Sequence, residues 1–287
     1  MKAPPFKYHA PKEVSEAVGL LADLPNARVL AGGQSLMPML NLRVAGPDHL
    51  IDLNQIMSLR RLEMEGDKLI TGAMCTQRMV ERSELVAQNC PLLHEAIQHV
   101  GHQQTRNRGT IGGSISHLDP GAELPVVGAA LDVEIEIASR MGTRRVTFKE
   151  FAQGYLTNCL EPDEIVTAIR WPIAPARTGA AFHEFNRRPA DFAVVSAAVQ
   201  ITLNDQDAIA ACAIALGGIQ GVPLVIDATS LIGRTDLHAT LGEELVRDIA
   251  CDGDDLYPPE FRHEIAAVLL QRALTQALER ARRAAHV

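Results

Sequence analysis

The chain has 287 residues, of which 47% are hydrophobic and 22% charged, and its formal net charge is −8. This length and composition are typical of a globular protein with two or three modules. The negative charge argues against a general nucleic-acid-binding protein, because phosphate binding requires clustered Lys and Arg. A few basic residues near the C-terminus are expected to be the solvated end of a helix. They are Arg280, Arg282 and Arg283.

No apolar run approaches the roughly 18 residues of a membrane span. The first residues, Met1-Lys2-Ala3-Pro4-Pro5, lack the apolar core of a signal peptide, so we expect a cytoplasmic protein. Five scattered cysteines form no C-x-x-C pair, which predicts free thiols and argues against an iron–sulfur cluster or a structural zinc held by this chain alone. They are Cys75, Cys90, Cys159, Cys212 and Cys251.

Residues 1–54 predict a small α/β module. Apolar residues recur at helical spacing over 11–24, and a short helix is expected at 36–41. Buried strands are expected at 28–31 and 49–53. The first of these strands runs into a glycine loop, Ala31-Gly32-Gly33-Gln34-Ser35.

Residues 55–175 predict a second module. Thr76 is a candidate N-cap. The polar stretch 101–109 leads into a second glycine loop, Thr110-Ile111-Gly112-Gly113-Ser114. Acidic and apolar residues alternate over 132–137, which indicates a half-buried antiparallel strand. The other expected elements are strands at 68–74, 144–148 and 165–171 and helices at 91–100 and 124–130.

A link rich in Pro and Ala at 172–178 is a candidate boundary, and residues 176–287 predict a third, α+β region. Two apolar runs around the polar turn 204–207 predict a hairpin. The expected elements are strands at 192–203 and 208–216 and helices at 237–250 and 260–284.

The two glycine loops are similar in sequence, and each ends in a residue with a hydroxyl side chain. Glycine lets a ligand approach the backbone closely, and successive backbone N–H groups in such turns form an anion-binding concavity. Brought together, the loops could hold an extended anionic cofactor such as a dinucleotide. Neither loop is the G-x-G-x-x-G of nicotinamide dehydrogenases or a Walker A motif. An ordinary strand-to-helix turn is the alternative for the first loop.

Other polar residues leave alternatives open. Asp119 and Glu123 either accept hydrogen bonds from sugar-like hydroxyls or serve as the N-cap and first turn of a helix, and both can hold. Arg106 and Arg108 set the electrostatics of a cofactor, face a partner, or lie solvated. The spacing of three nearby histidines does not favour metal binding, because they do not share a helix face. They are His94, His99 and His102.

Four segments carry a family resemblance: LAGGQSLMPMLNLR (30–43), QTRNRGTIGGS (104–114), DPGAELP (119–125) and FNRRPADFAVVSAAV (185–199). In this order they resemble the flavin-binding medium subunit of molybdenum hydroxylases, the family of carbon-monoxide dehydrogenase and xanthine dehydrogenase. The resemblance covers nearly the whole chain. It implies an α+β protein with an FAD-binding fold of the vanillyl-alcohol-oxidase type: FAD-binding subdomains at 1–54 and 55–175, then a C-terminal α+β domain at 176–287.

The resemblance also implies a set of residues that bind FAD, without a covalent bond because no His or Cys falls in the loop motifs. The first loop grips the pyrophosphate; its residues are Ala31, Gly32, Gly33, Gln34 and Ser35. The second loop lines the ribityl–pyrophosphate region; its residues are Thr110, Ile111, Gly112, Gly113 and Ser114. The acidic residues Asp119 and Glu123 contact the ribityl chain, Val100 and Val166 pack near the rings, and Phe192 lies by the isoalloxazine.

Three positions depart from the family pattern. Ser114 stands where the second loop usually ends in Asn, and it lacks an amide that can both donate and accept. Phe192 stands where some relatives carry Tyr. Gln34 stands where the carbon-monoxide enzymes resemble His, which points away from carbon monoxide as the substrate.

The implied function is electron transfer within a complex. Substrate oxidation would take place on a large subunit with the molybdenum cofactor, a small subunit with [2Fe-2S] clusters would relay electrons, and FAD on this chain would pass them to an external acceptor. We expect no catalytic residue and no metal ligand on this chain. The substrate class is an N-heteroaromatic, an aldehyde or carbon monoxide. The alternatives are a self-contained FAD oxidoreductase and a scaffold subunit that has lost FAD.

Overall fold

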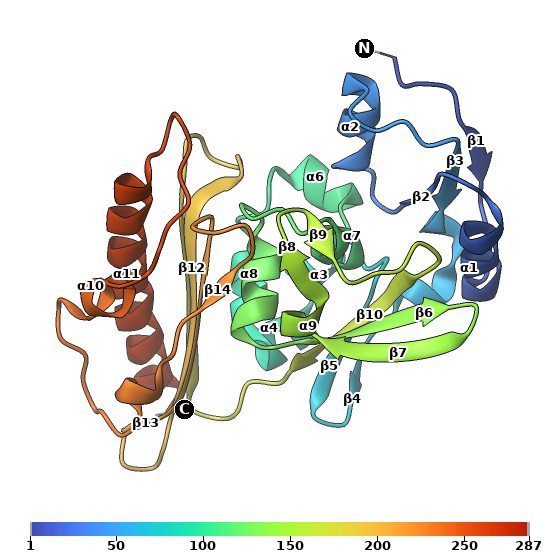
Figure 1. Cartoon of the computed structure of the whole chain (residues 1–287). Coiled ribbons are helices and arrows are strands. Elements are labelled where there is room, and N and C mark those ends of the chain that lie inside the picture. Colours follow the sequence, from blue (N-terminus) through green and yellow to red (C-terminus); the bar gives the residue numbers. More distant parts are fainter. Residues whose placement is uncertain (1, 286–287) are drawn as a thin grey trace.

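The computed structural model describes residues 2–285, whose three main sheets follow one another along the chain (Figure 1). The first sheet is parallel, with strand order β1-β3-β2. Helix α1 (Val14–Asp23) packs on it through the predicted apolar positions Ala17, Val18 and Leu21, and α2 (Leu36–Leu42) follows the first glycine loop. The strands are β1 (Lys7–His9), β2 (Ala27–Leu30) and β3 (His49–Asp52).

The second sheet is antiparallel, with order β4-β5-β10-β6-β7. The predicted alternation is confirmed in β6, where Ile135 and Ile137 are buried and Glu136 lies on the other face. That face is covered by ion pairs, because Glu136 contacts Arg61 at 2.8 Å and Arg170 at 3.1 Å. The strands are β4 (Leu62–Glu65), β5 (Lys68–Gly72), β6 (Glu134–Ser139), β7 (Gly142–Thr147) and β10 (Ile165–Pro172).

Short helices cover the apolar side of this sheet. The predicted helix over 91–100 is too long, because α5 ends at Ala96 and Gly101 adopts a φ of +46°. The polar stretch after it is a helix, α6, which was not predicted. The helices are α3 (Gln77–Glu81), α4 (Glu84–Asn89), α5 (Pro91–Ala96), α6 (Gln103–Arg108), α7 (Ile111–His117), α8 (Glu123–Ala130) and α9 (Phe148–Phe151).

Arg106 explains why this segment folds although its sequence is polar. Its guanidinium contacts Glu81 at 2.9 Å and donates to the carbonyls of Val100 and Gly101 at 2.9 and 2.8 Å. Arg106 therefore clamps α6 to α3 and to the end of the α5 segment. Of the three roles considered for it, a solvated side chain is wrong, because the guanidinium is engaged within the fold. The other two, setting the electrostatics of a cofactor and facing a partner, stay predictions.

The C-terminal sheet is antiparallel, with order β11-β12-β13-β14. Helix α11 (Pro259–Ala284) lies along its outer face, and α5 and α8 pack on the other (Figure 1). The predicted hairpin and last helix are confirmed. The strands are β11 (Thr178–Asn186), β12 (Ala193–Leu203), β13 (Ile209–Gly217) and β14 (Leu224–Val225), and the small sheet β8 (Ala152–Gly154) and β9 (Thr157–Asn158) precedes them.

The predicted helix at 237–250 is too long, because α10 spans only Leu241–Val246. Gln271 of α11 fixes its beginning: its side-chain oxygen accepts the N–H of Gly242 at 2.9 Å, and its amide donates to the carbonyl of His238 at 3.3 Å. Three short 3₁₀ helices complete the described part of the chain. They are η1 (Leu53–Gln55), η2 (Met57–Arg60) and η3 (Thr229–Leu231).

Arg280 was expected to lie solvated at the end of a helix, but its side chain is engaged within the fold. Its guanidinium bonds to the carboxylate of Glu95 in α5 and to the carbonyl of Ala180 in β11. Glu95 also accepts the N–H of Phe182 at 3.3 Å. These bonds tie α11 and the edge strand of the last sheet to the second module.

Two further expectations concern the whole chain. All five cysteines are free thiols, as predicted. Within residues 2–285, we find neither a helix long and apolar enough to cross a membrane nor a group of His, Cys, Asp and Glu arranged for a metal ion.

The core of the second module contains a buried polar pair that can be tested. Trp171 and Thr71 are fully buried, and the indole N–H donates to the Thr71 hydroxyl at 2.9 Å. We expect Thr71→Val to lower the free energy of unfolding by about 1–3 kcal/mol, because the indole N–H loses its partner. Chemical denaturation of both single variants and of the double variant with Trp171→Phe measures the coupling. An equal cost of Thr71→Val in both backgrounds would contradict this account.

Candidate cofactor site

The fold brings the two glycine motifs together. A Cβ atom on Gly32 would lie 2.1 Å from the carbonyl oxygen of Arg108, and one on Gly113 would lie 3.5 Å from the Cβ of Ala31. The first distance is far below van der Waals contact, so only glycine fits at position 32. The backbone of the first loop therefore rests directly on the backbone that precedes the second motif.

The first motif is a loop with free backbone donors. The N–H groups of its last four residues donate no hydrogen bond within residues 2–285. Gly33 adopts a φ of +74°, which favours glycine. The side chain of Gln34 folds back and donates to the carbonyl of Gly32 at 3.1 Å. A row of unpaired N–H groups is the arrangement that binds an anion. The four residues are Gly32, Gly33, Gln34 and Ser35.

The second motif was expected to be a loop, but it forms the first turn of α7. Thr110 is the N-cap, and its hydroxyl accepts the N–H of Gly113 at 3.1 Å. The N–H groups of Ile111 and Gly112 donate to the carbonyls of Cys75 and Ala73 at 3.0 and 2.9 Å. These donors hold α7 on the sheet and are not free for a ligand. The glycines serve close packing, since a Cβ on Gly112 would lie 2.5 Å from that of Ala73.

The acidic motif lies beside the start of the C-terminal sheet. Asp119 is not an N-cap, because its carboxylate accepts the N–H of Gly121 at 2.9 Å. Glu123 is the first residue of α8, so its expected place in the first turn of that helix is confirmed. A Cβ on Gly121 would lie 3.2 Å from that of Phe192. Phe192 is 59% exposed and is therefore not a core residue.

Glu123 is buried, with 3% of its surface exposed. Burial raises the pKa of its carboxyl to about 8, and the negative charges of Glu184 and Asp119 act in the same direction. The raised pKa favours the protonated carboxyl, which can donate a hydrogen bond as well as accept one. The sequence suggested only an acceptor, because the degree of burial depends on the tertiary fold.

The two valines expected near the cofactor rings belong to one core. Val100 and Val166 are 8% and 5% exposed and lie in the same hydrophobic cluster as Ile111. The structure thus joins the valines to the second glycine motif. It does not place them at an open surface, so only an edge of each side chain is accessible.

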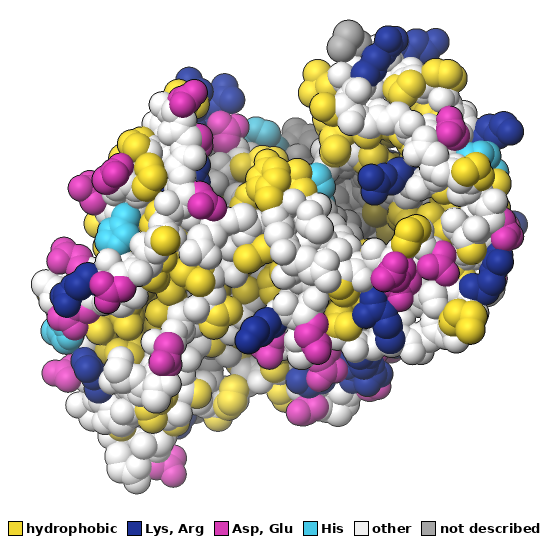
Figure 2. All heavy atoms as spheres, viewed as in Figure 1, with side chains coloured by type: hydrophobic (Ala, Val, Ile, Leu, Met, Phe, Trp, Pro, Cys, Tyr) yellow, Lys and Arg dark blue, Asp and Glu magenta, His cyan; other side chains and the backbone are white. Residues whose placement is uncertain are grey.

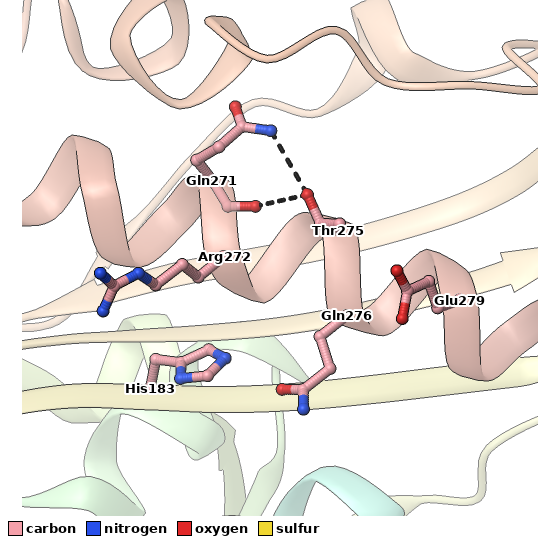
Figure 3. Close-up of a pocket in the computed structure, with 6 residues that line it drawn as sticks. All are labelled: His183, Gln271, Arg272, Thr275, Gln276 and Glu279. Carbon is pink, nitrogen blue, oxygen red and sulfur yellow. Dashed lines mark hydrogen bonds between the residues drawn. The ribbon is translucent and has the colours of Figure 1, made fainter.

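Two depressions lie elsewhere. One, of about 360 Å³, is between α11 and β11, where the Thr275 hydroxyl donates to the carbonyl of Gln271 at 2.9 Å (Figure 3). The other, of about 500 Å³, is between α5 and β11. Neither contains a predicted cofactor residue. The surface view shows a hollow between the lobe that carries α2 and the middle of the molecule (Figure 2). An extended ligand suits such an open groove better than a closed pocket.

Comparison with known proteins decides the family. Residues 4–174 match the family described as the FAD binding domain in molybdopterin dehydrogenase, and residues 180–277 match the CO dehydrogenase flavoprotein C-terminal domain. The chain belongs to the FAD-binding subunits of molybdenum hydroxylases. It is therefore an oxidoreductase subunit with an α+β fold, as the four segments predicted.

Relatives match along nearly the whole chain. The carbon monoxide dehydrogenase medium chain of Afipia carboxidovorans is 35% identical over 96% of this chain and 98% of its own. Caffeine dehydrogenase subunit beta of a Pseudomonas species is 36% identical over 98% and 97%. In the crystal structure of quinoline 2-oxidoreductase from Pseudomonas putida 86, the matching chain is 34% identical over 98% of this chain and 99% of its own, with a TM-score of 0.93.

In this FAD-binding subunit, the residues of the first loop fit the pyrophosphate of FAD. The N–H groups of the loop are free, and its backbone contacts Arg108 at a distance that only glycine allows. The cysteine nearest the second motif is not available for a covalent link. Cys75 is fully buried, its thiol contacts the carbonyl of Arg61 at 2.9 Å, and burial raises its pKa to about 11.

The contact at Gly32 can be tested with a matched pair of variants. We expect Gly32→Ala to push the first loop away from Arg108 and weaken FAD binding about tenfold to a hundredfold, because a charge-assisted hydrogen bond contributes about 1.5–3 kcal/mol. Gly46→Ala is the control, since no atom lies within 4 Å of its added Cβ. Titration of both variants with FAD measures the difference, and native affinity in a folded Gly32→Ala protein would contradict this placement.

Phe192 can be tested by the spectrum of the bound cofactor. We expect Phe192→Ala to shift the visible absorption of FAD and weaken its binding up to about tenfold, because an aromatic contact contributes roughly 0.5–1.5 kcal/mol. The exposed side chain supports little of the fold, so stability should change little. Leu256→Ala, at another exposed apolar residue, is the control. An unchanged spectrum and affinity would remove Phe192 from the site.

Proposed function

We propose that this chain is the electron-transfer subunit of a molybdenum-containing hydroxylase. In this role it binds FAD without a covalent bond, receives electrons from [2Fe-2S] clusters on a small subunit, and passes them to an external acceptor. The substrate is oxidised on a large subunit that holds the molybdenum cofactor. The observation that carries the proposal is the first glycine loop, which has free N–H groups and whose backbone lies against Arg108 and Gly109, just before the second motif.

The protein's part is to position and shield the cofactor, whose own chemistry is the acceptance and release of electrons. The first loop binds the pyrophosphate, with Gly32 and Gly33 at the closest approach. Asp119 and Glu123 bind the hydroxyls of the ribityl chain. Phe192 covers the flavin ring from the C-terminal domain. We name no proton-transferring catalytic residue on this chain.

We further propose the division into subdomains at 1–54 and 55–175 and a C-terminal domain at 176–287. The succession of a parallel sheet and two antiparallel sheets supports these boundaries. We propose a cytoplasmic location and an assembly of three unlike chains. The subunit names of the relatives, medium chain and subunit beta, support such an assembly.

The proposed substrate class is an N-heteroaromatic compound, an aldehyde or carbon monoxide. Relatives named for caffeine and quinoline support the first class, and one named for carbon monoxide supports the last. Gln34 favours the classes other than carbon monoxide. The residues that select the substrate would lie on the large subunit.

The proposal is tested by comparing the lone chain with the assembled complex. We expect the purified chain to bind FAD and to oxidise no heteroaromatic compound or aldehyde. Co-expressed with its molybdenum and iron–sulfur partners, it should co-purify with them, and substrate should bleach the flavin absorption. In the reconstituted complex, omitting the iron–sulfur chain is the control and should prevent bleaching.

Two results would replace the proposal. Turnover by the lone chain at an enzymatic rate, about 1–10³ per second, would establish a self-contained oxidoreductase. A colourless chain that does not bind added FAD would establish a scaffold subunit.

A further inference from the structure

One polar side chain is buried beside the contact between the two glycine motifs. Gln77 is the first residue of α3 and is 5% exposed, and its side-chain oxygen has no hydrogen-bond partner among the residues that the structure describes. The N–H of Gln77 donates to the carbonyl of Gly109 at 2.8 Å, and the Thr76 hydroxyl caps α3 by accepting the N–H of Met79 at 3.2 Å. The backbone of Gln77 is therefore fixed next to Gly109.

The amide of Gln77 occupies the space that a side chain at position 109 would need. A Cβ on Gly109 would lie 2.4 Å from the side-chain oxygen of Gln77, 2.8 Å from its Cδ and 3.1 Å from the carbonyl oxygen of Thr105. The backbone itself does not require glycine, because the φ of −55° and ψ of 140° at Gly109 suit most residues. Lack of space beside Gln77 is therefore the reason for glycine at this position.

Gly109 also lies against the first loop, since a Cβ on Gly32 would lie 2.9 Å from its Cα. It therefore contacts a side chain of the second module and the backbone of the first. We call Gln77, Gly109 and Gly32 the loop support. Arg106 adds to it, because its contact with Glu81 at 2.9 Å holds α6, which ends just before Gly109, against α3. Gly109 thus has little freedom to move away from Gln77.

Packing accounts for the position of the Gln77 side chain. A buried oxygen without a partner is unfavourable, so hydrogen bonding of that oxygen does not hold the side chain in place. Protein interiors are close-packed, and a change of even one methylene group is felt by neighbouring atoms. A change in the length of residue 77 should therefore be transmitted through Gly109 to the first loop.

We propose that Gln77 is a positioning residue for the cofactor. Its side chain holds Gly109 against Gly32 and so sets the position of the first loop, whose free N–H groups bind the pyrophosphate of FAD. Gln77 acts through Gly109 and not by contact with the cofactor. This inference rests on the proposed binding of FAD, and it assigns to the second module a part in shaping a loop of the first.

The first test exchanges size within the loop support and measures the affinity of the full chain for FAD by fluorescence titration. Gly109→Ala should weaken binding about tenfold, because the added methyl group does not fit beside Gln77 unless the backbone moves. Gln77→Ala should weaken it by about threefold to tenfold, because Gly109 loses its support. The double variant should bind more tightly than either single variant, because the methyl group at position 109 fills the space that the amide leaves. A role in stability alone would not restore affinity in this way.

Two further variants complete this series. Gln77→Met restores the length of the side chain without the amide and should recover most of the affinity that Gln77→Ala loses. Gln88→Ala, at an exposed glutamine of the neighbouring helix α4, is the matched control and should bind FAD as the native chain does. If Gly109→Ala does not fold, the double variant decides, since it should fold and bind FAD. Losses that add up in the double variant, or a double variant that does not fold, overturn the inference.

The second test does not use FAD. Chemical denaturation of the cofactor-free full chain should show that Gly109→Ala lowers the midpoint more in the native background than in the Gln77→Ala background. A chain that binds no FAD would contradict the proposed function, while this comparison would still report whether Gln77 supports Gly109. Equal shifts in the two backgrounds overturn the loop support and leave the binding of FAD unaffected.

Discussion

The contact of one backbone with another at Gly32 is the constraint on which the proposed cofactor site depends. The first loop belongs to the parallel sheet, and the carbonyl of Arg108 and the Cα of Gly109 belong to the second module. Any side chain at position 32 would separate them. Because the contact is made by main-chain atoms, its geometry is set by the two modules and not by flexible side chains. A long anionic ligand that crosses from one module to the other meets a surface fixed on both sides.

A chain of hydrogen bonds holds the base of the first loop. Tyr8 in β1 donates to Asp52 at 2.5 Å, Asp52 accepts from the Asn54 amide at 2.6 Å, and the same amide donates to the carbonyl of Ala31 at 2.9 Å. This series of hydrogen bonds continues into the second module, since Arg60 donates to the carbonyl of Asn54 at 2.9 Å. These bonds use the carbonyls around the loop and leave its N–H groups free, which is what anion binding requires.

Local patterns predicted the elements whose cause is local. The helix over 260–284 and the strand over 193–203 have long, regular apolar faces that need no distant partner to be recognised. Short motifs and their order in the sequence predicted that the two glycine motifs lie together, and they supplied most of the residues of the candidate site. What the sequence could not show depends on contacts between distant residues. The second motif becomes a helix because Ala73 and Cys75 accept its N–H groups, and α6 forms because Arg106 reaches Glu81.

The same reasoning explains why Glu184 escaped the sequence analysis. In the sequence it is one polar residue in a strand, and only the register with Ser196 and the packing of α5 on β11 bury its side chain. Burying a carboxyl is unfavourable unless it is paired or hydrogen-bonded. The Arg280–Glu95 contact at the same boundary shows that a neutralised acid is compatible with this packing. Glu184 is also engaged by distant parts of the fold, because one of its carboxylate oxygens lies 3.4 Å from Nδ1 of His99. The acids of this boundary are therefore held by tertiary contacts that no local pattern in the sequence encodes.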